Sequence, residues 1–428
     1  MEKQEKVLMG QRELKRWHLM KMVEVGKITL GEAGEKIGVS YRQAKRIGRA
    51  IRERGIRGLV HGNRGRPSNN RLNEPLGKKV LKLSKEVYWD FNDTHFAEKL
   101  RECEGIDLNR EMVRKLRRGA GIAPKRRRRG PKHRKRRERK AQEGWMVLWD
   151  GSPHPWFGPD HPPCCLMAAI DDATGKLLAA RFFPFEGSSG YFWLLKEMVK
   201  KYGIPMVIYQ DRHGALHRND SHWSLEEQLA GRQEPTQVGL ALQTLGIEPI
   251  SALSPQAKGR VEKLFATLQD RLIAELRLKG VVTIEEANRF LQSTFLKDFN
   301  RRFAVRPRES QKAWREVPNH LDLDRIISFR YTATVGNDNT ARLGGLVLDI
   351  PPGPQRRSYA KVKVEARQLL NGAWRIYAQD QLIAKHPPTS LQEPVRALPR
   401  KKHHTKGVKD YHWVYLASAP QREANLNP

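Results

Sequence analysis

Three acidic residues have types and positions that could support metal-dependent chemistry at a phosphodiester. Asp150 ends an apolar run that begins at Trp145, Asp211 ends another that begins at Met206, and Glu262 lies near the start of a long amphipathic stretch. Carboxylates that converge from two strand ends and one helix can hold two Mg²⁺ ions, roughly 3.5–4 Å apart, for in-line displacement at phosphorus. Asp150, Asp211 and Glu262 are therefore candidate catalytic residues and metal ligands, and Mn²⁺ could substitute for Mg²⁺.

The elements around these acids are typical of a mixed α/β domain at residues 144–320. The strands that end at Asp150 and Asp211 can lie side by side, and a long helix opened by Ser254-Pro255 can cover their ends. A loop insertion is expected at 217–238. The predicted strands are 145–150, 164–171, 176–183, 206–211 and 247–253, and the predicted helices are 188–202, 239–245 and 254–278.

Each acid also has a plainer explanation. An Asp after a strand is often a turn residue, and Asp171 and Asp172 are predicted to form a hairpin turn in this way. A Glu on a helix is usually solvated. The joint pattern favours catalysis, and the sequence has no P-loop or Ser-His-Asp signature that would suggest another mechanism.

A zinc site is not expected. The candidate ligands are three histidines and two cysteines whose spacing fits no closed four-ligand pattern. Surface or loop positions are predicted for the histidines. These residues are His213, His217, His222, Cys164 and Cys165.

Positive charge is concentrated in the first third of the chain. The sequence has 80 Lys and Arg against 47 Asp and Glu, a formal net charge of +33. Residues 1–144 carry 41 of these basic residues and 18 of the acidic ones. Basic side chains that neutralise phosphates release counterions, so this excess predicts double-stranded DNA as a partner and argues against an enzyme of small neutral metabolites.

Residues 10–60 have the pattern of a helix-turn-helix DNA-binding domain. Thr29 and Ser40 are candidate N-caps, and Gly38 supplies the turn between two helices. The second helix is basic on its polar side, which is typical of a helix that enters the major groove. A basic surface helix in an ordinary bundle is the alternative. The candidate DNA contacts on this helix are Arg42, Gln43, Lys45, Arg46 and Arg49.

Two linkers and a second helical domain follow. A polar linker is expected at 61–75, and residues 76–123 are either a second, winged helix-turn-helix or a plain helical spacer. Twelve of the seventeen residues from 124 to 140 are Lys or Arg. Such dense charge predicts an extended linker at 124–143, which either follows a DNA backbone or is simply solvated. The candidate contacts there are Arg126, Arg127, Arg128 and Arg129.

The C-terminal part alternates apolar and polar residues. Residues 326–386 are predicted to form a small β-barrel, for DNA or protomer contacts or as a structural cap, followed by a tail at 387–428. Three cysteines make a disulfide framework improbable, no apolar run could span a membrane, and the first residues do not form a signal peptide. A cytoplasmic, nucleoid-associated prokaryotic protein without a membrane partner is expected.

Three motifs resemble those of DDE-type insertion-sequence transposases. They are Trp149-Asp150-Gly151-Ser152, Gln210-Asp211-Arg212-His213-Gly214 and the segment Ser254 to Lys263, SPQAKGRVEK. These transposases belong to the retroviral integrase superfamily and have an RNase H-like core, and within them the chain resembles the ISNCY group. The resemblance covers roughly residues 10–320 and ends with the segment 300–307, NRRFAVRP.

The resemblance implies a fold, an activity and partners. The fold is an all-α helix-turn-helix, an α/β RNase H-like core and a small β-barrel. The activity is binding of the terminal inverted repeats, 3′-end cleavage and strand transfer into target DNA, performed by a dimer or higher oligomer. The implied metal ligands are Asp150, Asp211 and Glu262, and Lys258 and Arg260 would lie near the transposon end.

Two departures from the family pattern and two alternatives remain. The interval from Asp211 to Glu262 is longer than in compact members, and Gln269 stands where many relatives have Lys or Arg. Arg271 could take that role, or the contact could differ. The alternative functions are an inactive DNA-binding regulator that keeps the fold, and an RNase H-like nuclease acting on RNA–DNA hybrids.

Overall fold

The computed structural model describes residues 9–61, 63–65, 72–126, 130, 137–218, 223, 225–231, 233–252 and 259–389. The chain divides into two compact units, Met1–Leu83 and Ser84–Pro428. No helix in these ranges is long and apolar enough to cross a membrane.

The first unit contains three helices with well-defined ends. They are α1 (Gln11–Glu24), α2 (Leu30–Ile37) and α3 (Tyr41–Arg54), followed by the 3₁₀ turn Gly55–Leu59. The Thr29 hydroxyl accepts from Glu32 N and the Ser40 hydroxyl from Gln43 N, both at 3.3 Å, so both predicted N-caps are confirmed. Gly38 ends α2 with φ +78°, a conformation that favours glycine.

The second unit is built around a five-stranded mixed sheet. The strands are β1 (Met146–His154), β2 (Cys164–Asp171), β3 (Leu177–Phe183), β4 (Val207–Gln210) and β5 (Glu248–Ser251). Their order is β3-β2-β1-β4-β5. The first three are antiparallel neighbours, and β4 is parallel to both β1 and β5. The strand that carries Asp150 is therefore central.

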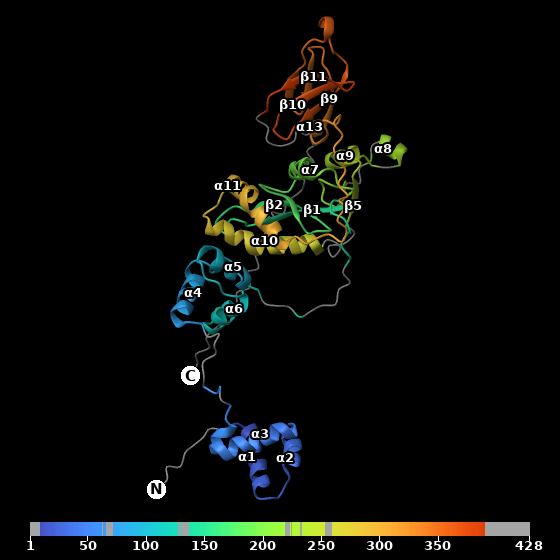
Figure 1. Cartoon of the computed structure of the whole chain (residues 1–428). Coiled ribbons are helices and arrows are strands. Elements are labelled where there is room, and N and C mark those ends of the chain that lie inside the picture. Colours follow the sequence, from blue (N-terminus) through green and yellow to red (C-terminus); the bar gives the residue numbers. More distant parts are fainter. Residues whose placement is uncertain are drawn as a thin grey trace, which may run out of the picture. The chain divides into compact units, whose positions relative to one another are not determined.

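Helices cover both faces of this sheet (Figure 1). On one face lie α7 (Ser188–Tyr202) and α9 (Gln237–Thr244), whose apolar side chains share a core with Val147, Trp149 and Ile208. On the other lies α10 (Gly259–Leu278), packed on Leu148. The amphipathic stretch predicted here buries one face, formed by Val261, Leu264, Phe265, Leu268 and Leu272. The short helix α8 (Leu225–Ala230) falls within the predicted insertion.

Two asparagine side chains form hydrogen bonds with main-chain groups of β3, the strand at one edge of the sheet. They come from the run formed by α11 (Ile284–Phe290), a π-helical turn (Leu291–Phe295) and α12 (Leu296–Phe303). Asn288 bonds the main-chain N and O of Phe182 at 2.7 and 3.1 Å, and Asn300 bonds those of Leu177 at 2.7 and 2.9 Å. An edge strand closed in this way offers few main-chain groups to another chain.

The helices α4 (Glu74–Glu86), α5 (Asp93–Cys103) and α6 (Arg110–Gly119) precede the sheet. No strand occurs within residues 72–126. The β-wing of a winged helix-turn-helix, one of the two alternatives for residues 76–123, is therefore not formed. Side chains of α5 and of the segment before it bond α10 and α12, mostly through ion pairs. These pairs are Arg277–Asp90, Arg271–Glu98, Lys99–Glu275, Arg302–Glu98 and Arg302–Glu102.

The C-terminal region contains six strands after α13 (Leu323–Ile326). A four-stranded antiparallel sheet has the order β11-β10-β9-β6, and β7 and β8 form a separate ribbon. Phe329 packs edge-on against Phe192 of α7, with 5.1 Å between ring centroids. These pairings do not close into a ring, so the predicted barrel is not confirmed. The strands are β6 (Phe329–Thr334), β7 (Thr340–Leu343), β8 (Leu346–Asp349), β9 (Lys363–Gln368), β10 (Trp374–Ala378) and β11 (Gln381–His386).

Candidate active site

The register of two parallel strands brings Asp150 beside Asp211. β1 and β4 pair as Met146↔Val207, Val147↔Ile208 and Leu148↔Tyr209. Two residues beyond the last pair, the same register aligns Asp150 with Asp211, directly after the end of β4. Both residues are partly buried. Acids that are 61 positions apart in the chain thus share one edge of the sheet.

The alternation of β1 directs Asp150 toward α10. Leu148 packs in the α10 core, and the Ser152 hydroxyl accepts from Gln269 Nε2 of α10 at 3.3 Å. Asp150 lies between these two positions, and residues two apart in a strand share a face. Gln269, where relatives were expected to have a basic residue, therefore contacts the strand that carries the first acid.

Glu262 lies in the first turn of α10 and its side chain is exposed. Its neighbour Val261 is fully buried, which holds this turn of the helix on the sheet. The segment 253–258, which contains Ser254-Pro255 and Lys258, lies outside the described residues. Among the described residues, no three His, Cys, Asp or Glu side chains are close enough together to hold a metal ion.

A fourth carboxylate lies against the strand that carries Asp150. Glu186 follows β3, and its Oε1 accepts a hydrogen bond of 2.5 Å from the Tyr191 hydroxyl. A Cβ placed on Gly151 would lie 2.5 Å from the Glu186 carboxyl group, so only glycine leaves room for this approach. Glu186 was not predicted as a site residue, although an acid just after the end of β3 is visible in the sequence.

Charge accumulates around Tyr191 and Cys165. Burial, reinforced by the charges of Glu186, Asp150 and Asp211, raises the pKa of Tyr191 far above its ordinary value, so the phenol stays protonated and donates to Glu186. Burial, with Glu186 and Asp150 adding to it, raises the pKa of Cys165 to about 12. The negative charges of Glu186, Asp150 and Asp211 therefore lie close to the same buried side chain, that of Tyr191.

The loop after Asp211 is folded onto that acid. Asp211 Oδ1 accepts from His213 N at 2.9 Å, and His213 Nδ1 accepts from Ala215 N at 3.2 Å. The same Nδ1 lies 3.9 Å from Glu186. His213 is thus a loop residue that orients the second acid.

The hairpin acids Asp171 and Asp172 behave differently from each other. Asp171 accepts from the main chain of Gly144 and from Thr174, so its predicted turn role is confirmed. Asp172 has a fully buried side chain and pairs with Arg137 and Arg260. The guanidinium of Arg260, a predicted DNA contact, is engaged by this buried acid and by the Arg137 carbonyl.

The Arg271 side chain of α10 binds Glu98 of α5. Its guanidinium bonds both Glu98 oxygens at 2.7 and 3.0 Å and lies 4.8 Å from the Phe303 ring centroid. The side chain is only 10% exposed. The suggestion that Arg271 replaces a basic DNA contact at position 269 therefore does not agree with where this guanidinium lies.

The remaining predicted DNA contacts fall into three groups. All five on α3 are exposed, whereas Ala44 and Ile47 of the same helix are buried. Arg126 is exposed, and its charge adds to burial in lowering the pKa of His154. Arg127, Arg128, Arg129 and Lys258 lie outside the described residues.

Two curated proteins are similar to this chain over most of its length. The y4bF protein of Sinorhizobium fredii, which is assigned as a transposase, is 38% identical over 320 residues, covering 75% of this chain and 68% of that protein. The transposase for insertion sequence IS1202 of Streptococcus pneumoniae is 30% identical over 435 aligned positions, with 91% of each chain covered. No family model matches the sequence.

Solved structures give a weaker likeness. A chain of the simian T-cell lymphotropic virus intasome, in complex with the B56 gamma subunit of PP2A, matches 72% of this chain with 14% identity and a TM-score of 0.30. The HTLV-2 integrase catalytic core with magnesium matches 36% with 15% identity and a TM-score of 0.24. On the identity that it shares with the two curated relatives, the chain belongs to the transposases of insertion sequences.

Proposed function

We propose that this transposase cleaves the 3′ ends of its element and joins them to target DNA, with Asp150, Asp211 and Glu262 as the metal-binding catalytic residues. The observation that carries the proposal is the β1–β4 register, which aligns Asp150 with Asp211 beside a helix whose first turn contains Glu262. Carboxylate oxygens are the ligands that Mg²⁺ prefers, so this donor set fits the ion. Mg²⁺ would stabilise negative charge on the attacking and leaving oxygens of the phosphodiester.

The protein's own part in this reaction is positioning. The Asp211 carboxylate is oriented by the His213 amide, and Asp150 is held on a central strand that is hydrogen-bonded on both sides. Tyr191 stays protonated and donates to Glu186, which fixes that fourth carboxylate against Gly151. These contacts limit how far the candidate acids can move when DNA enters.

DNA recognition belongs to the proposal as well. The turn geometry at Gly38 and the exposed basic side of α3 support a helix-turn-helix that reads the terminal repeats. Two transposon ends have to be joined in one reaction, so assembly of a dimer or higher oligomer on DNA is expected.

The test uses a labelled duplex that ends in the inverted repeat flanking the reading frame. Asp150→Asn, Asp211→Asn and Glu262→Gln should each lower the rate of 3′-end cleavage and of strand transfer at least about 100-fold, because each loses an ionised ligand. Binding of the same duplex should change little. Asp349→Asn, an exposed acid on β8, is the matched control.

Undiminished product from any of the three variants would remove that residue from the mechanism. Specific DNA binding by a wild-type protein that cuts nothing with either Mg²⁺ or Mn²⁺ would favour a regulator. Cleavage confined to RNA–DNA hybrids would favour a nuclease.

A further inference from the structure

We infer that a cavity beside Asp211, on the α9 face of the sheet, receives one unstacked nucleobase of the DNA that the transposase processes. The inference rests on the proposed function, because it assigns the cavity to the same DNA. The cavity has a volume of about 710 Å³ and is lined by three segments: the end of β4 with β5, the loop 216–218, and α9 with the residues before it. Ligand cavities of this size are typical for a group as large as a nucleotide.

The position of the cavity links it to the candidate active site. Gln210, the last residue of β4, lines the cavity, and the next residue is Asp211. Successive strand residues point to opposite faces, so the cavity and the acid are separated by one step of the backbone. A nucleotide whose phosphate lies near Asp211 could therefore turn its base into the cavity.

A buried amide supplies a hydrogen-bond donor to this cavity. The Gln210 side chain is 2% exposed, and its Oε1 accepts from Trp149 Nε1 at 3.2 Å. An indole N–H can only donate, so the orientation of the amide is determined and Nε2 is the remaining group. Among the described residues Nε2 has no hydrogen-bond partner. Nε2 is not itself a buried atom, so it can donate to a ligand or water in the cavity, and base edges carry acceptors for such a donor.

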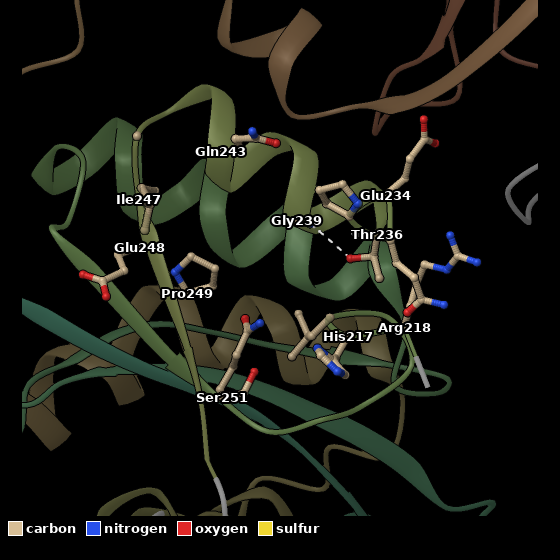
Figure 2. Close-up of a pocket in the computed structure, with 15 residues that line it drawn as sticks. His217, Arg218, Glu234, Thr236, Gly239, Gln243, Ile247, Glu248, Pro249 and Ser251 are labelled. Atoms are coloured by element: carbon tan, nitrogen blue, oxygen red, sulfur yellow. Dashed lines mark hydrogen bonds between the residues drawn. The ribbon is translucent and has the colours of Figure 1, made fainter. Parts of the chain in front are cut away.

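A hydrogen-bonded turn of the main chain places an aromatic side chain at the rim. The amides of Leu216 and His217 both donate to His213 O, at 2.8 and 2.9 Å, and Leu216 is buried in the core. This turn presents the exposed His217 across the hollow from Pro249 and Ser251 of β5 (Figure 2). Histidine rings are among those on which unstacked bases stack.

The charge of the lining favours a base over a phosphate. Among the described residues, Glu234 and Glu248 line the cavity, and the one guanidinium in that described lining, that of Arg218, is paired with the buried Glu227. Carboxylates repel a phosphate, whereas the neutral edge of a base meets the Gln210 amide and the Ser251 side chain. The base is therefore the part of the nucleotide that fits.

The experiment is a fluorescence scan with the full-length protein. 2-Aminopurine is placed, one position at a time, across the cleavage junction of the terminal-repeat duplex, with Ca²⁺ replacing Mg²⁺ so that binding is observed without cleavage. We expect one position to brighten severalfold when wild-type protein binds, because an unstacked base loses its quenching neighbours. His217→Ala and Gln210→Leu should remove at least half of that rise, and His217→Phe should restore it.

Controls separate a binding pocket from loss of fold. Thr244→Ala, an exposed change on α9 outside the lining, should leave the signal unchanged. Replacing the brightened nucleotide by an abasic site should weaken wild-type binding at least about fivefold, a loss expected from one stacked base. His217→Ala should then lose nothing further on the abasic duplex.

Two outcomes would overturn the inference. One is a duplex that is bound specifically but brightens at no position, and the other is brightening that both variants retain in full. Failure of the proposed function looks different, because the wild-type protein would then show no specific binding of the repeat, or no cleavage once Mg²⁺ is restored. If a protein without cleavage activity still gave the expected brightening, the cavity would remain assigned to a nucleobase and the proposed cleavage chemistry would be rejected.

Discussion

His95 of α5 and Glu275 of α10 form a buried contact, with 2.8 Å between Nε2 and Oε1. Lys99 reaches the same oxygen at 2.7 Å. The His95 Nδ1 atom is buried and has no hydrogen-bond partner in the described structure. Burial, which outweighs the hydrogen bond that His95 donates to Glu275, lowers the pKa of His95. The contact therefore connects the helices before the sheet to the catalytic domain through a neutral histidine.

Acid should weaken this contact. The pKa of His95 is lower in the folded than in the unfolded chain, so below pH 6.5 the unfolded chain binds the extra proton and stability falls. Burial raises the pKa of Glu275, but hydrogen bonds from His95 and Lys99 outweigh it, so its contribution is lost only below about pH 4.5. The free energy of unfolding of the wild-type protein should therefore fall by up to about 1.4 kcal/mol for each pH unit just below pH 6.5, as measured by thermal unfolding.

His95→Gln is the matched variant for this prediction. It keeps a polar group near Glu275 and removes the titration, so its melting temperature should change less between pH 6.5 and 5.5 than that of wild type. Parallel curves for the two proteins would contradict the assigned role of His95.

Removing the Arg271 guanidinium should destabilise the protein without reporting on DNA contact. Arg271→Met leaves the partly buried Glu98 with Arg302 as its one remaining ion-pair partner in the described part of the chain. We expect a loss of about 2–3 kcal/mol in chemical unfolding, less than for a fully orphaned buried charge. Arg301→Met, in an exposed pair with Asp298, should cost at most about 0.5 kcal/mol. Equal losses for both variants would refute this explanation.

Gly151→Ala should impair cleavage more than it impairs DNA binding. The added methyl group would lie 2.5 Å from the Glu186 carboxyl and would displace it from beside the first acid. We expect cleavage to slow at least about tenfold, because small misplacements of reacting groups have effects of this size. Gly214→Ala has open space around the new methyl group and should retain activity. Similar rates in both variants would mean that Glu186 is irrelevant.

The exposed face of α3 should account for sequence-specific binding. If the Arg42 and Arg46 side chains contact bases, Arg42→Ala and Arg46→Ala should each lose about 1–3 kcal/mol of DNA-binding free energy. If the side chains contact a phosphate, each variant should instead reduce the slope of log affinity against log salt by about one. Lys36→Ala, an exposed lysine on α2, is the control. Binding titrations at several salt concentrations distinguish these cases, and wild-type behaviour of both arginine variants would exclude α3 as the reading helix.

Elements with strong local signals could be predicted from the sequence. The strand Cys164–Asp171 and the helix Ser188–Tyr202 have the predicted bounds, and α3 starts directly after its Ser40 cap. A continuous apolar run, an amphipathic period and a capping hydroxyl depend on neighbouring residues alone. Such elements need no long-range contact to be recognised.

The C-terminal strands were predicted less well. Alternation continues through Leu343–Ile350, but a turn at Gly344-Gly345, with φ of +53° and +88°, separates β7 from β8 there. Alternation also begins near Tyr359, yet β9 starts only at Lys363, because the backbone turns at Lys361 with φ +63°. Alternation in a short window does not determine where a chain reverses.

The candidate site was only partly predictable. Asp150 and Asp211 could be paired because strand order follows from the sequence of elements. The roles of Glu186, Tyr191 and Gln210 depend on close approaches between segments that lie far apart in the chain, such as Glu186 against Gly151. No spacing rule identifies such approaches.

The ion pairs between α5 and the catalytic helices have a geometric consequence. Because Glu98, Glu102 and Asp90 bind arginines of α10 and α12, the α5–α6 pair cannot shift along α10 without breaking several charged contacts. The spacing between α5 and the first turn of α10, where Glu262 lies, is therefore fixed within the fold.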